Sequence, residues 1–485
     1  MKLQSILEDY PFRLIKGSLD VDIKGIEKDS RNVEVGSLFI AEKGFTVDGH
    51  DFIHKAIENG ASAIIVEKDI HIEEDNVTII QVENSTDALA KFSGVFYKEP
   101  WNDMDMIGIT GTNGKTSTTY FIKSIFEKDN KKIGTIGTIG AIIDNKLTSL
   151  NNTTPNALVI HNALKEMVEA KTDTCIMEVS SHALELKRVE YMKFQVGLFT
   201  NLTKEHLDYH ETMDNYFNSK LKLFYMTNKY NIVNIDDDYG KKIIQVIGKR
   251  VPILTYGINN KSDIFASDIE YSLSKVSFIL NMPNGKVKVR LNIPGEFSIY
   301  NALAAASCGY AYGIDLETIK NGLEAVEGVK GRFEVVPTNT DYTVIIDFAH
   351  TADGLEKVLT VIDQFAEGRK IVVFGAGGNR DKTKRPEMGE TVGKHADLSI
   401  VTSDNPRHED PEKIIEDVLV GTKKANGKYV SIVDRVEAIK YALDNAEPKD
   451  IILLAGKGHE TYTLIGDETI PCDERQIVID YLNNN

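Results

Sequence analysis

A chain of 485 residues is too long for one hydrophobic core, and about 150 residues per domain predicts three domains. The formal charge of −17 at pH 7 argues against nucleic acid or an anionic membrane as a partner, because the mean field of the protein repels both. Three widely spaced cysteines (Cys175, Cys308 and Cys472) do not form a disulfide framework, which favours the reducing cytoplasm. The sequence begins without the apolar run of a signal peptide, and no stretch approaches about 18 consecutive apolar residues, so we expect neither export nor a membrane span.

Residues 1–98 are expected to form a small α/β domain. Turn signals and one helical stretch separate short apolar runs at 37–41, 61–67 and 77–82. Polar loops at 29–31 and 44–50 could bind a ligand, but ordinary turn chemistry is the favoured interpretation. Pro100, beside the only tryptophan, marks a linker into the next domain.

Residues 106–116 (Met-Ile-Gly-Ile-Thr-Gly-Thr-Asn-Gly-Lys-Thr) have the order strand, glycine loop, helix. The apolar residues that follow fall on one helix face: Phe121, Ile122, Ile125 and Phe126. This order is typical of a phosphate cradle, in which backbone N–H groups point at phosphate oxygens, Lys115 supplies a charge and Thr116 can hold Mg²⁺. The strict P-loop has four residues between its glycines, whereas five separate Gly108 from Gly114, so an ordinary strand–turn–helix corner stays an alternative.

Two apolar runs downstream, 174–178 and 194–199, predict buried strands. A buried strand rarely contains a glutamate unless it is paired or binds a metal, so Glu178 is a candidate Mg²⁺ ligand, with a salt-bridged carboxylate as the alternative. His206 and His210 are four apart, which on a helix puts both on one face, but the glutamate that a zinc protease needs after the first histidine is missing. Lys220 lies in an amphipathic helical segment, where a solvated lysine is the favoured interpretation.

Residues 331–334 (Gly-Arg-Phe-Glu) indicate a hinge into a third unit. Buried strands at 343–347, 370–374, 398–402 and 450–454 then alternate with helices, which predicts a parallel, doubly wound sheet. Residues 375–380 imitate a dinucleotide fingerprint, but Arg380 stands where the last glycine belongs, which argues against NAD. Ligands of open α/β sheets bind at the carboxyl ends of strands, where this unit has polar residues. These are Asp347, His350, Arg380, Asp404, Arg407, Lys457 and Glu460.

Together these segments resemble the Mur ligases from end to end. The motifs that carry the resemblance, in family order, are Thr110-Gly-Thr-Asn-Gly-Lys-Thr116, Asn152-Thr-Thr-Pro155, Glu178-Val-Ser-Ser-His182, His206-Leu-Asp-Tyr-His210, Lys220 ahead of Leu223-Phe224, Asp347-Phe-Ala-His350 and Asp404-Asn-Pro-Arg407. The resemblance implies an α/β protein with a UDP-sugar-binding N-terminal domain (1–98), a central P-loop-like ATPase domain (99–331) and a C-terminal doubly wound, Rossmann-like domain (332–485) that brings the amino acid.

The implied activity is an ATP-dependent ligation in peptidoglycan precursor synthesis. The D-glutamyl carboxylate of UDP-N-acetylmuramoyl-L-alanyl-D-glutamate attacks the γ-phosphate of ATP, and an amine then attacks the acyl phosphate. Arg407 can grip a carboxylate with two hydrogen bonds, and meso-diaminopimelate has a second carboxylate where lysine has none, so meso-diaminopimelate is the expected amino acid. We expect a cytoplasmic monomer whose partners are these small molecules, with ATP and Mg²⁺. The alternatives are L-lysine addition, a folylpolyglutamate synthase-like ligase and a non-catalytic ATP-binding switch.

The resemblance also assigns the site residues. ATP is expected to contact Thr110, Gly111, Thr112, Asn113, Gly114, Lys115, Thr116, Asn301, Arg332 and Asp347. The UDP substrate is expected to contact Ser30, Phe45, Thr46, Val47, Asn152, Thr153, Thr154, Ser180 and Arg188. The amino acid is expected to contact Arg380, Asp404, Asn405, Pro406, Arg407, Gly456 and Glu460.

Mg²⁺ is expected to bind Thr116, Glu178, His206 and Lys220, the last as a carbamate because a free ammonium would repel the ion. The expected catalytic residues are Lys115, Glu178, His206 and Lys220. Leu186 stands two positions before Arg188, where the family often has a glutamine that contacts the substrate, so the resemblance does not assign this contact.

Overall fold

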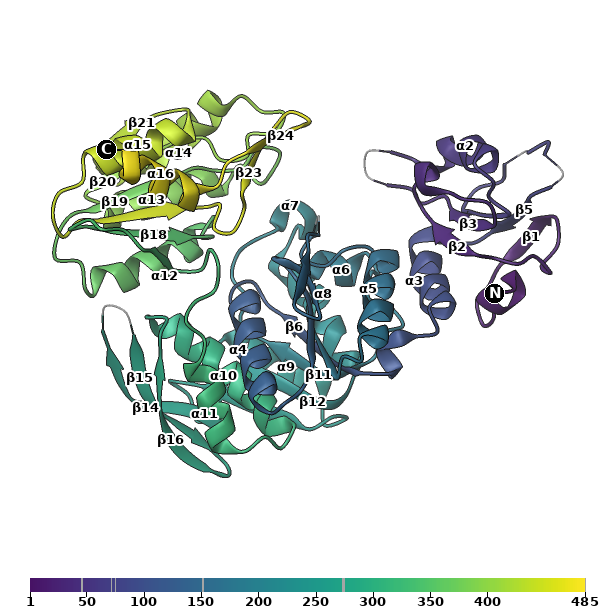
Figure 1. Ribbon diagram of the computed structural model, residues 1–485, viewed down its shortest axis with the longest axis horizontal. Coiled ribbons are helices and arrows are strands. Elements are labelled where there is room, and N and C mark those ends of the chain that lie inside the picture. Colours follow the sequence, from purple (N-terminus) through teal and green to yellow (C-terminus); the bar gives the residue numbers. More distant parts are fainter. Residues whose placement is uncertain (45–46, 71, 75, 151, 273–274, 485) are drawn as a thin grey trace.

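The computed structural model describes residues 1–44, 47–70, 72–74, 76–150, 152–272 and 275–484. Each of the three predicted units contains one main sheet, and the N-terminal and C-terminal units lie on different sides of the central one (Figure 1). The predicted α/β architecture is confirmed. Among the described helices, none is long and apolar enough to cross a membrane.

The N-terminal sheet has the strand order β1-β5-β4-β3-β2, and only β1 runs antiparallel to its neighbour. Its central strands are wholly buried, as the short apolar runs of the sequence predict. The strands are β1 (Arg13–Lys16), β2 (Gly25–Glu27), β3 (Ser37–Ile40), β4 (Ala63–Val66) and β5 (Thr78–Gln81). The helices are α1 (Leu3–Ile6), α2 (Ile53–Glu58) and α3 (Ser85–Phe96).

The central sheet has eleven strands in the order β16-β15-β14-β13-β12-β11-β6-β10-β7-β8-β9. The seven strands from β14 to β7 in this order are parallel. Antiparallel strands extend the sheet at both ends, β8 and β9 next to β7, and β15 and β16 next to β14. The strands are β6 (Asp105–Thr110), β7 (Ile133–Gly137), β8 (Gly140–Ile143), β9 (Lys146–Thr148), β10 (Thr174–Glu178), β11 (Phe194–Phe199), β12 (Thr227–Asn234), β13 (Ile253–Gly257), β14 (Ile264–Tyr271), β15 (Val276–Met282) and β16 (Gly285–Leu291).

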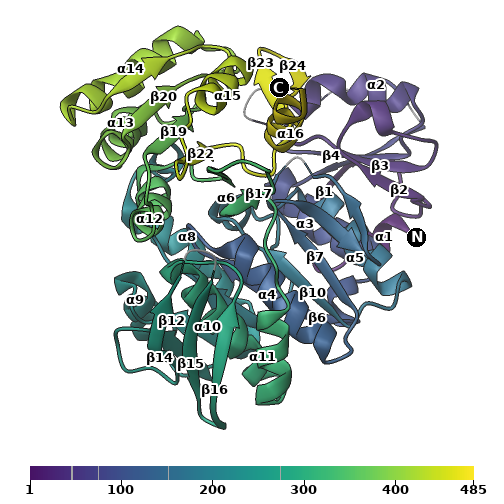
Figure 2. The same cartoon turned by 60° about the vertical axis from the view of Figure 1, so that its left-hand side comes forward.

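Helices cover both faces of the central sheet. The face towards α4, α10 and α11 buries the apolar stripe predicted for residues 121–126 (Figure 2). The other face packs against α5 and α8. The helices are α4 (Lys115–Lys128), α5 (Ala157–Glu169), α6 (Ser181–Glu185), α7 (Leu207–His210), α8 (Met213–Tyr225), α9 (Asp238–Ile247), α10 (Glu296–Ala311) and α11 (Leu316–Glu324).

The C-terminal sheet has the order β17-β18-β22-β19-β20-β21 and is parallel except for the edge strand β17. Apolar cores lie on both of its faces, so the doubly wound prediction is confirmed. The strands are β17 (Glu334–Val336), β18 (Thr343–Asp347), β19 (Lys370–Phe374), β20 (Leu398–Val401), β21 (Tyr429–Ser431) and β22 (Ile451–Ala455), with a separate hairpin of β23 (Tyr462–Ile465) and β24 (Glu468–Pro471). The helices are α12 (Ala352–Asp363), α13 (Lys384–His395), α14 (Pro411–Lys424), α15 (Arg435–Asp444) and α16 (Glu474–Asn484).

Candidate active site

The phosphate loop lies between the carboxyl end of β6 and the first turn of α4. Two of its glycines are required by close packing: a Cβ on Gly111 would lie 1.9 Å from Thr200 Oγ1, and one on Gly114 would lie 2.4 Å from Asn301 Oδ1. Gly114 also has a positive φ of +86° and directly precedes α4. The first N–H groups of this helix have no intrahelical partner, so the loop is suited to bind an anion.

The Lys115 ammonium lies over this loop. Its Nζ donates to the carbonyl oxygens of Gly111 at 2.9 Å and Thr112 at 2.8 Å. Burial lowers the pKa of Lys115, whereas the nearby carboxylates of Glu178 and Glu205 oppose that shift. A phosphate bound here would meet the cation at short range in a site shielded from water, where charge interactions are strong.

Glu178 ends β10, which pairs in parallel with β6 so that Glu178 lies opposite Ile109. Its carboxylate accepts hydrogen bonds from Thr116 Oγ1 at 3.0 Å and from the backbone N–H and the Oγ1 of Thr138, at 3.1 and 2.9 Å. No basic side chain of the described residues forms an ion pair with this buried carboxylate, so the salt-bridge alternative is not supported. The paired oxygens of Thr116 and Glu178 fit the ligand preference of Mg²⁺.

Lys220 is buried on α8, so the interpretation as a solvated lysine is wrong. Its Nζ donates to the Gly111 carbonyl at 2.9 Å and lies 4.7 Å from the centre of the Tyr216 ring. Burial, reinforced by the charge of Lys115, holds the pKa of Lys220 well below its usual value. The side chain therefore reaches the phosphate loop from a helix that is distant in sequence.

His206 and His210 do not share a helix face, because α7 begins only at Leu207 and His206 precedes it with a φ of +57°. The buried His210 ring lies 2.9 Å from Ser181 Oγ, whereas the His206 ring lies 4.8 Å from that of His182. Within the described part of the chain, no three His, Cys, Asp or Glu side chains are grouped as a metal site. A divalent cation here would depend on hydroxyl, carboxylate and substrate oxygens.

The residues predicted to hold the muramoyl-dipeptide join directly to Glu178. Thr154 Oγ1 donates to the Glu178 carbonyl at 2.8 Å and accepts from the Ser180 N–H at 3.0 Å. The Arg188 guanidinium donates to the Thr154 carbonyl at 2.7 Å, and Thr153 Oγ1 lies 3.1 Å from Thr138 Oγ1. Thr153, Thr154, Ser180 and Arg188 therefore form one patch beside the phosphate loop.

Of the other predicted substrate residues, the structure describes Asn152, which precedes Thr153, and Ser30 and Val47 in the N-terminal unit. Asn152 is exposed, and Leu186 is half-buried. In the N-terminal unit, Ser30 is buried and Val47 is 55% exposed. Phe45 and Thr46 lie outside the described residues.

Three predicted ATP contacts come from outside the loop. Asn301 on α10 accepts from Thr118 Oγ1 at 3.3 Å. Arg332 Nη2 donates to Thr116 Oγ1 at 3.4 Å, so the hinge segment touches the phosphate loop. Asp347 accepts the backbone N–H groups of Phe333 and Ala349, both at 2.7 Å, so in this structure its carboxylate holds the hinge.

The predicted amino-acid residues converge at the carboxyl ends of β20 and β22. Asn405 Nδ2 donates to Glu460 Oε2 at 3.0 Å, and Asn405 Oδ1 accepts from Lys457 Nζ at 3.2 Å. The same ammonium lies 3.5 Å from Asp404. Burial raises the pKa of Glu460, and the Asn405 amide opposes that shift. Asn405 thus holds Glu460, whereas Asp404 lies beside the buried Lys457.

Four further predicted residues complete this region. Arg407 Nη1 donates to the Gly378 carbonyl at 2.9 Å, and Arg380 is exposed. Pro406 is buried, and a Cβ on Gly456 would lie 2.6 Å from Asp404 Oδ2.

Sequence reasoning missed two acidic residues between the central and C-terminal units, Glu205 and Asp353. Glu205 Oε1 lies 3.2 Å from His350 Nε2, and the Asp353 carboxylate accepts from Asn113 Nδ2 at 2.8 Å and from Thr203 Oγ1 at 3.2 Å. His350 was noted as a polar strand-end residue and as the last residue of the motif that starts at Asp347, without a role. Glu205 directly precedes the motif that starts at His206, which is the one signal that could have found it.

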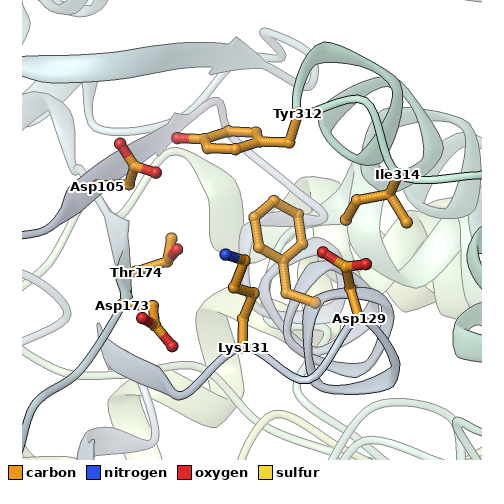
Figure 3. A pocket seen from close by; sticks show the side chains of 8 residues that line it. Asp105, Asp129, Lys131, Asp173, Thr174, Tyr312 and Ile314 are labelled. Carbon is orange, nitrogen blue, oxygen red and sulfur yellow. The ribbon is translucent and has the colours of Figure 1, made fainter.

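A separate hollow of about 270 Å³ lies at the opposite, amino ends of β6 and β10. The Lys131 side chain points between the strand β6 residue Asp105 and the neighbouring Asp173 (Figure 3). None of the predicted site residues lines this hollow. The phosphate loop leaves the other end of β6, so the hollow is not part of the candidate active site.

Comparison with known proteins agrees with this geometry over the whole chain. Residues 22–97 match the model "Mur ligase family, catalytic domain", residues 109–309 match "Mur ligase middle domain" and residues 331–458 match "Mur ligase, glutamate ligase domain". A UDP-N-acetylmuramoyl-L-alanyl-D-glutamate–2,6-diaminopimelate ligase of Alkaliphilus oremlandii is 49% identical over 99% of this chain and 98% of its own length.

Two further relatives bear the same name. The Clostridioides difficile protein is 44% identical over the full length of both chains. A solved structure is 30% identical, with a TM-score of 0.69 over 100% of this chain and 99% of its own. The chain belongs to the Mur ligase family.

Proposed function

We propose that this ligase adds meso-diaminopimelate to UDP-N-acetylmuramoyl-L-alanyl-D-glutamate at the expense of ATP, in the synthesis of peptidoglycan precursors. The observation that carries the proposal is that the Arg407 guanidinium and the Glu460 carboxylate lie in one region at the strand ends of the third unit, each held by Asn405. The far end of meso-diaminopimelate has one carboxylate and one ammonium, which match this cation and this anion. Relatives that are 44–49% identical are named for the same reaction.

The first step activates a carboxylate, because direct condensation with an amine in water is uphill. The D-glutamyl carboxylate attacks the γ-phosphorus of ATP, the bond to the β-γ bridging oxygen breaks, and ADP leaves. This brings two anions together, so Lys115 and the N–H groups at the start of α4 act by neutralising charge on the phosphate oxygens. Arg188 and its neighbours Thr154 and Ser180 hold the dipeptide beside the loop.

The second step forms the amide. The amine of the amino acid attacks the acyl carbon, loses a proton, and phosphate leaves. The acyl phosphate is also open to attack by water, so the third unit has to cover the site while it delivers the amine. The third unit meets the central unit beside the phosphate loop through the contacts of Arg332, Asp353 and His350.

Lys220 is proposed to act as a carbamate. A neutral amine is needed to react with carbon dioxide, and the low pKa of the buried Lys220 favours that neutral form. Mg²⁺ supplies positive charge against the phosphate oxygens when it is bound; Thr116 and Glu178 would hold one ion, and His206 with the Lys220 carbamate would hold a second.

The experiment that tests the proposal is ADP release with the UDP-muramoyl-dipeptide and either meso-diaminopimelate or L-lysine. Release that depends on both the dipeptide and meso-diaminopimelate supports it. Turnover with L-lysine but not with meso-diaminopimelate would show that L-lysine is the amino acid substrate. Turnover with a folate acceptor would indicate a folylpolyglutamate synthase-like enzyme. ATP hydrolysis without any acceptor would favour a nucleotide switch.

Arg407→Ala is expected to raise the KM for meso-diaminopimelate about 100-fold, since two charge-assisted hydrogen bonds are lost. The KM for ATP should stay within about twofold of wild type, because Arg407 lies in the third unit away from the phosphate loop. The neighbouring His408→Ala is the control, since that side chain is exposed. An equal rise in the KM for ATP and for the amino acid would contradict the role given to Arg407.

A further inference from the structure

The glycine-rich segment 375–378, which imitates a dinucleotide fingerprint, has a packing role in this structure. A Cβ on Gly375 would lie 2.2 Å from the Thr402 carbonyl oxygen, and one on Gly378 would lie 1.9 Å from the Pro406 carbonyl oxygen. The Gly378 N–H donates to the Asn405 carbonyl at 2.9 Å. These glycines let residues 375–380 lie directly against residues 402–409, so that the two loops form one unit.

Two charged residues join the same loops. Arg385 is 1% exposed, and its Nη2 donates to both carboxylate oxygens of Glu409, at 3.1 and 3.0 Å, and to the Gly377 carbonyl at 3.3 Å. Glu409 also accepts from the Asn379 N–H and pairs with Lys382 at 3.2 Å. Glu409 therefore comes from the loop that carries Arg407 and is bound by Asn379 of the loop that carries Arg380, and by Lys382 and Arg385, which follow that loop. Arg385 Nη1 also donates to Asp417 of α14 at 2.9 Å.

The two arginines need such a connection because they repel each other. The two side chains are neighbours, because a Cβ on Gly377 would lie 3.1 Å from Arg407 Nη1 and 3.9 Å from Arg380 Cγ. Burial lowers the pKa of Arg407, and the charge of Arg380 lowers it further. Arg407 is also held in an uncommon backbone conformation, with a φ of +52°. Of its guanidinium nitrogens, only Nη1 has a hydrogen-bond partner among the described residues, so Nε and Nη2 are available to a ligand.

We propose that Glu409, bound by the buried Arg385, is a positioning residue for amino-acid selection, because it holds the Arg407 loop against the Arg380 loop. This inference rests on the proposed function, since it concerns how the site recognises the second carboxylate of meso-diaminopimelate. Glu409 and Arg385 do not touch the amino acid. They fix two like charges side by side before the substrate arrives, so that the substrate carboxylate meets a cationic site that is already assembled.

The test is steady-state ADP release by Glu409→Gln and by Arg385→Lys in the full chain. Glu409→Gln removes one of the two anions that bind the buried Arg385 and leaves the other, Asp417. Arg385→Lys keeps the charge but loses the planar guanidinium. For both variants the KM for meso-diaminopimelate should rise about 10-fold, with kcat and the KM for ATP within about twofold of wild type. The ratio of kcat/KM for meso-diaminopimelate to that for L-lysine should fall by the same factor.

Glu412→Gln is the matched control, because it makes the same change of charge three residues along at an exposed position. An unchanged KM for meso-diaminopimelate in Glu409→Gln would overturn the inference. A parallel loss of kcat and of affinity for all three substrates, with a lower melting temperature, would also overturn it, because a merely structural role predicts that result. If the wild-type enzyme itself does not use meso-diaminopimelate, the proposed function fails first, so the two failures are distinguishable.

Discussion

The joint between the N-terminal and central units is mainly apolar. Helix α3 packs against α5, and the apolar core of the N-terminal unit includes Ala157 and Leu158 at the start of α5. Trp101 and His161 are both buried at this joint, with ring centres 5.1 Å apart. Asp87 of α3 adds one polar cluster that reaches into the central unit.

The joint between the central and C-terminal units differs, because many of its contacts use the polar groups of the active site. Asp353 accepts from Asn113 of the phosphate loop, and Arg332 donates to Thr116. Glu205 pairs with His350 beside the His206 motif. The apolar part of this joint lies at the hinge, where α10 and the segment after Gly331 meet.

This difference indicates which joint can rearrange during turnover. Apolar burial stabilises the first joint by about 25 cal/mol per Å², and no substrate competes for it. A polar contact contributes about 1 kcal/mol net, and ATP or its phosphates can replace it at the loop. We therefore expect the N-terminal unit to be a fixed platform and the C-terminal unit to move about its hinge.

The largest expected effect comes from Gly331→Ala at that hinge. Gly331 has a φ of +69°, and its Cβ would lie 2.2 Å from the His459 backbone nitrogen, so the chain must shift where it enters the third unit. A shift of about 1 Å in a positioning element can lower the rate about 100-fold. We expect ADP release to fall about 100-fold, while the UDP substrate binds to the free enzyme with unchanged affinity in calorimetry.

Gly313→Ala is the matched control. Its φ of +74° imposes the same backbone strain, but a Cβ there would meet nothing within 4 Å. Similar activities of the two variants would show that strain alone, and not displacement of the third unit, explains the loss.

Much of this organisation is predictable from the sequence, because it depends on local patterns. The segment 106–116 shows its strand, loop and helix through composition and periodicity, and the doubly wound sheet follows from the alternation after residue 343. The antiparallel strands β14–β16 were not predicted, although their alternating burial is a period-two signal that a closer count could have found.

The features that were not predicted depend on contacts between distant segments. Lys220 looks like a solvated helix lysine until α8 packs beneath the phosphate loop and buries it. Glu409 and Arg385 are ordinary charged residues in sequence, and only the packing of two loops joins them. Residues 375–378 look like a nucleotide fingerprint, because close backbone approach to a ligand and to a neighbouring loop both require glycine.

A smaller effect is expected from Asp87→Ala at the N-terminal joint. The buried carboxylate accepts from Lys187 Nζ at 2.8 Å, Tyr191 Oη at 2.8 Å and Tyr10 Oη at 3.0 Å. Losing these bonds should lower the free energy of unfolding by about 2 kcal/mol. The urea transition followed by fluorescence of Trp101, the only tryptophan, measures this change at the joint itself.

The same variant sharpens the comparison between the joints. Lys187 directly precedes Arg188, which is proposed to bind the substrate, so the KM for the UDP substrate should rise a few-fold, while the KM for ATP stays constant. Asp69→Ala, at an exposed position of the same unit, is the control. A change in the KM for ATP would show that the N-terminal joint also affects the phosphate loop, and that the N-terminal unit is not a fixed platform.

The smallest effect is the pH dependence that His161 gives to this joint. Burial lowers the pKa of His161 to about 4, although the backbone of Ala90 opposes that shift. The unfolded chain, with a pKa near 6.5, then binds a proton more readily than the folded one. Stability is therefore fully present above about pH 6.5 and is lost as the pH falls towards 4, by about 1 kcal/mol between pH 7 and 5.5.

His161→Phe keeps a ring against Trp101 but removes the titrating group. The difference in unfolding free energy between wild type and His161→Phe should therefore shift by about 1 kcal/mol in favour of the variant between pH 7 and 5.5. Urea titrations at both pH values measure this difference and cancel the contribution of the other histidines. If the difference in unfolding free energy between wild type and His161→Phe does not change with pH, water reaches His161 in the folded protein. The apolar joint would then open more easily than the polar one.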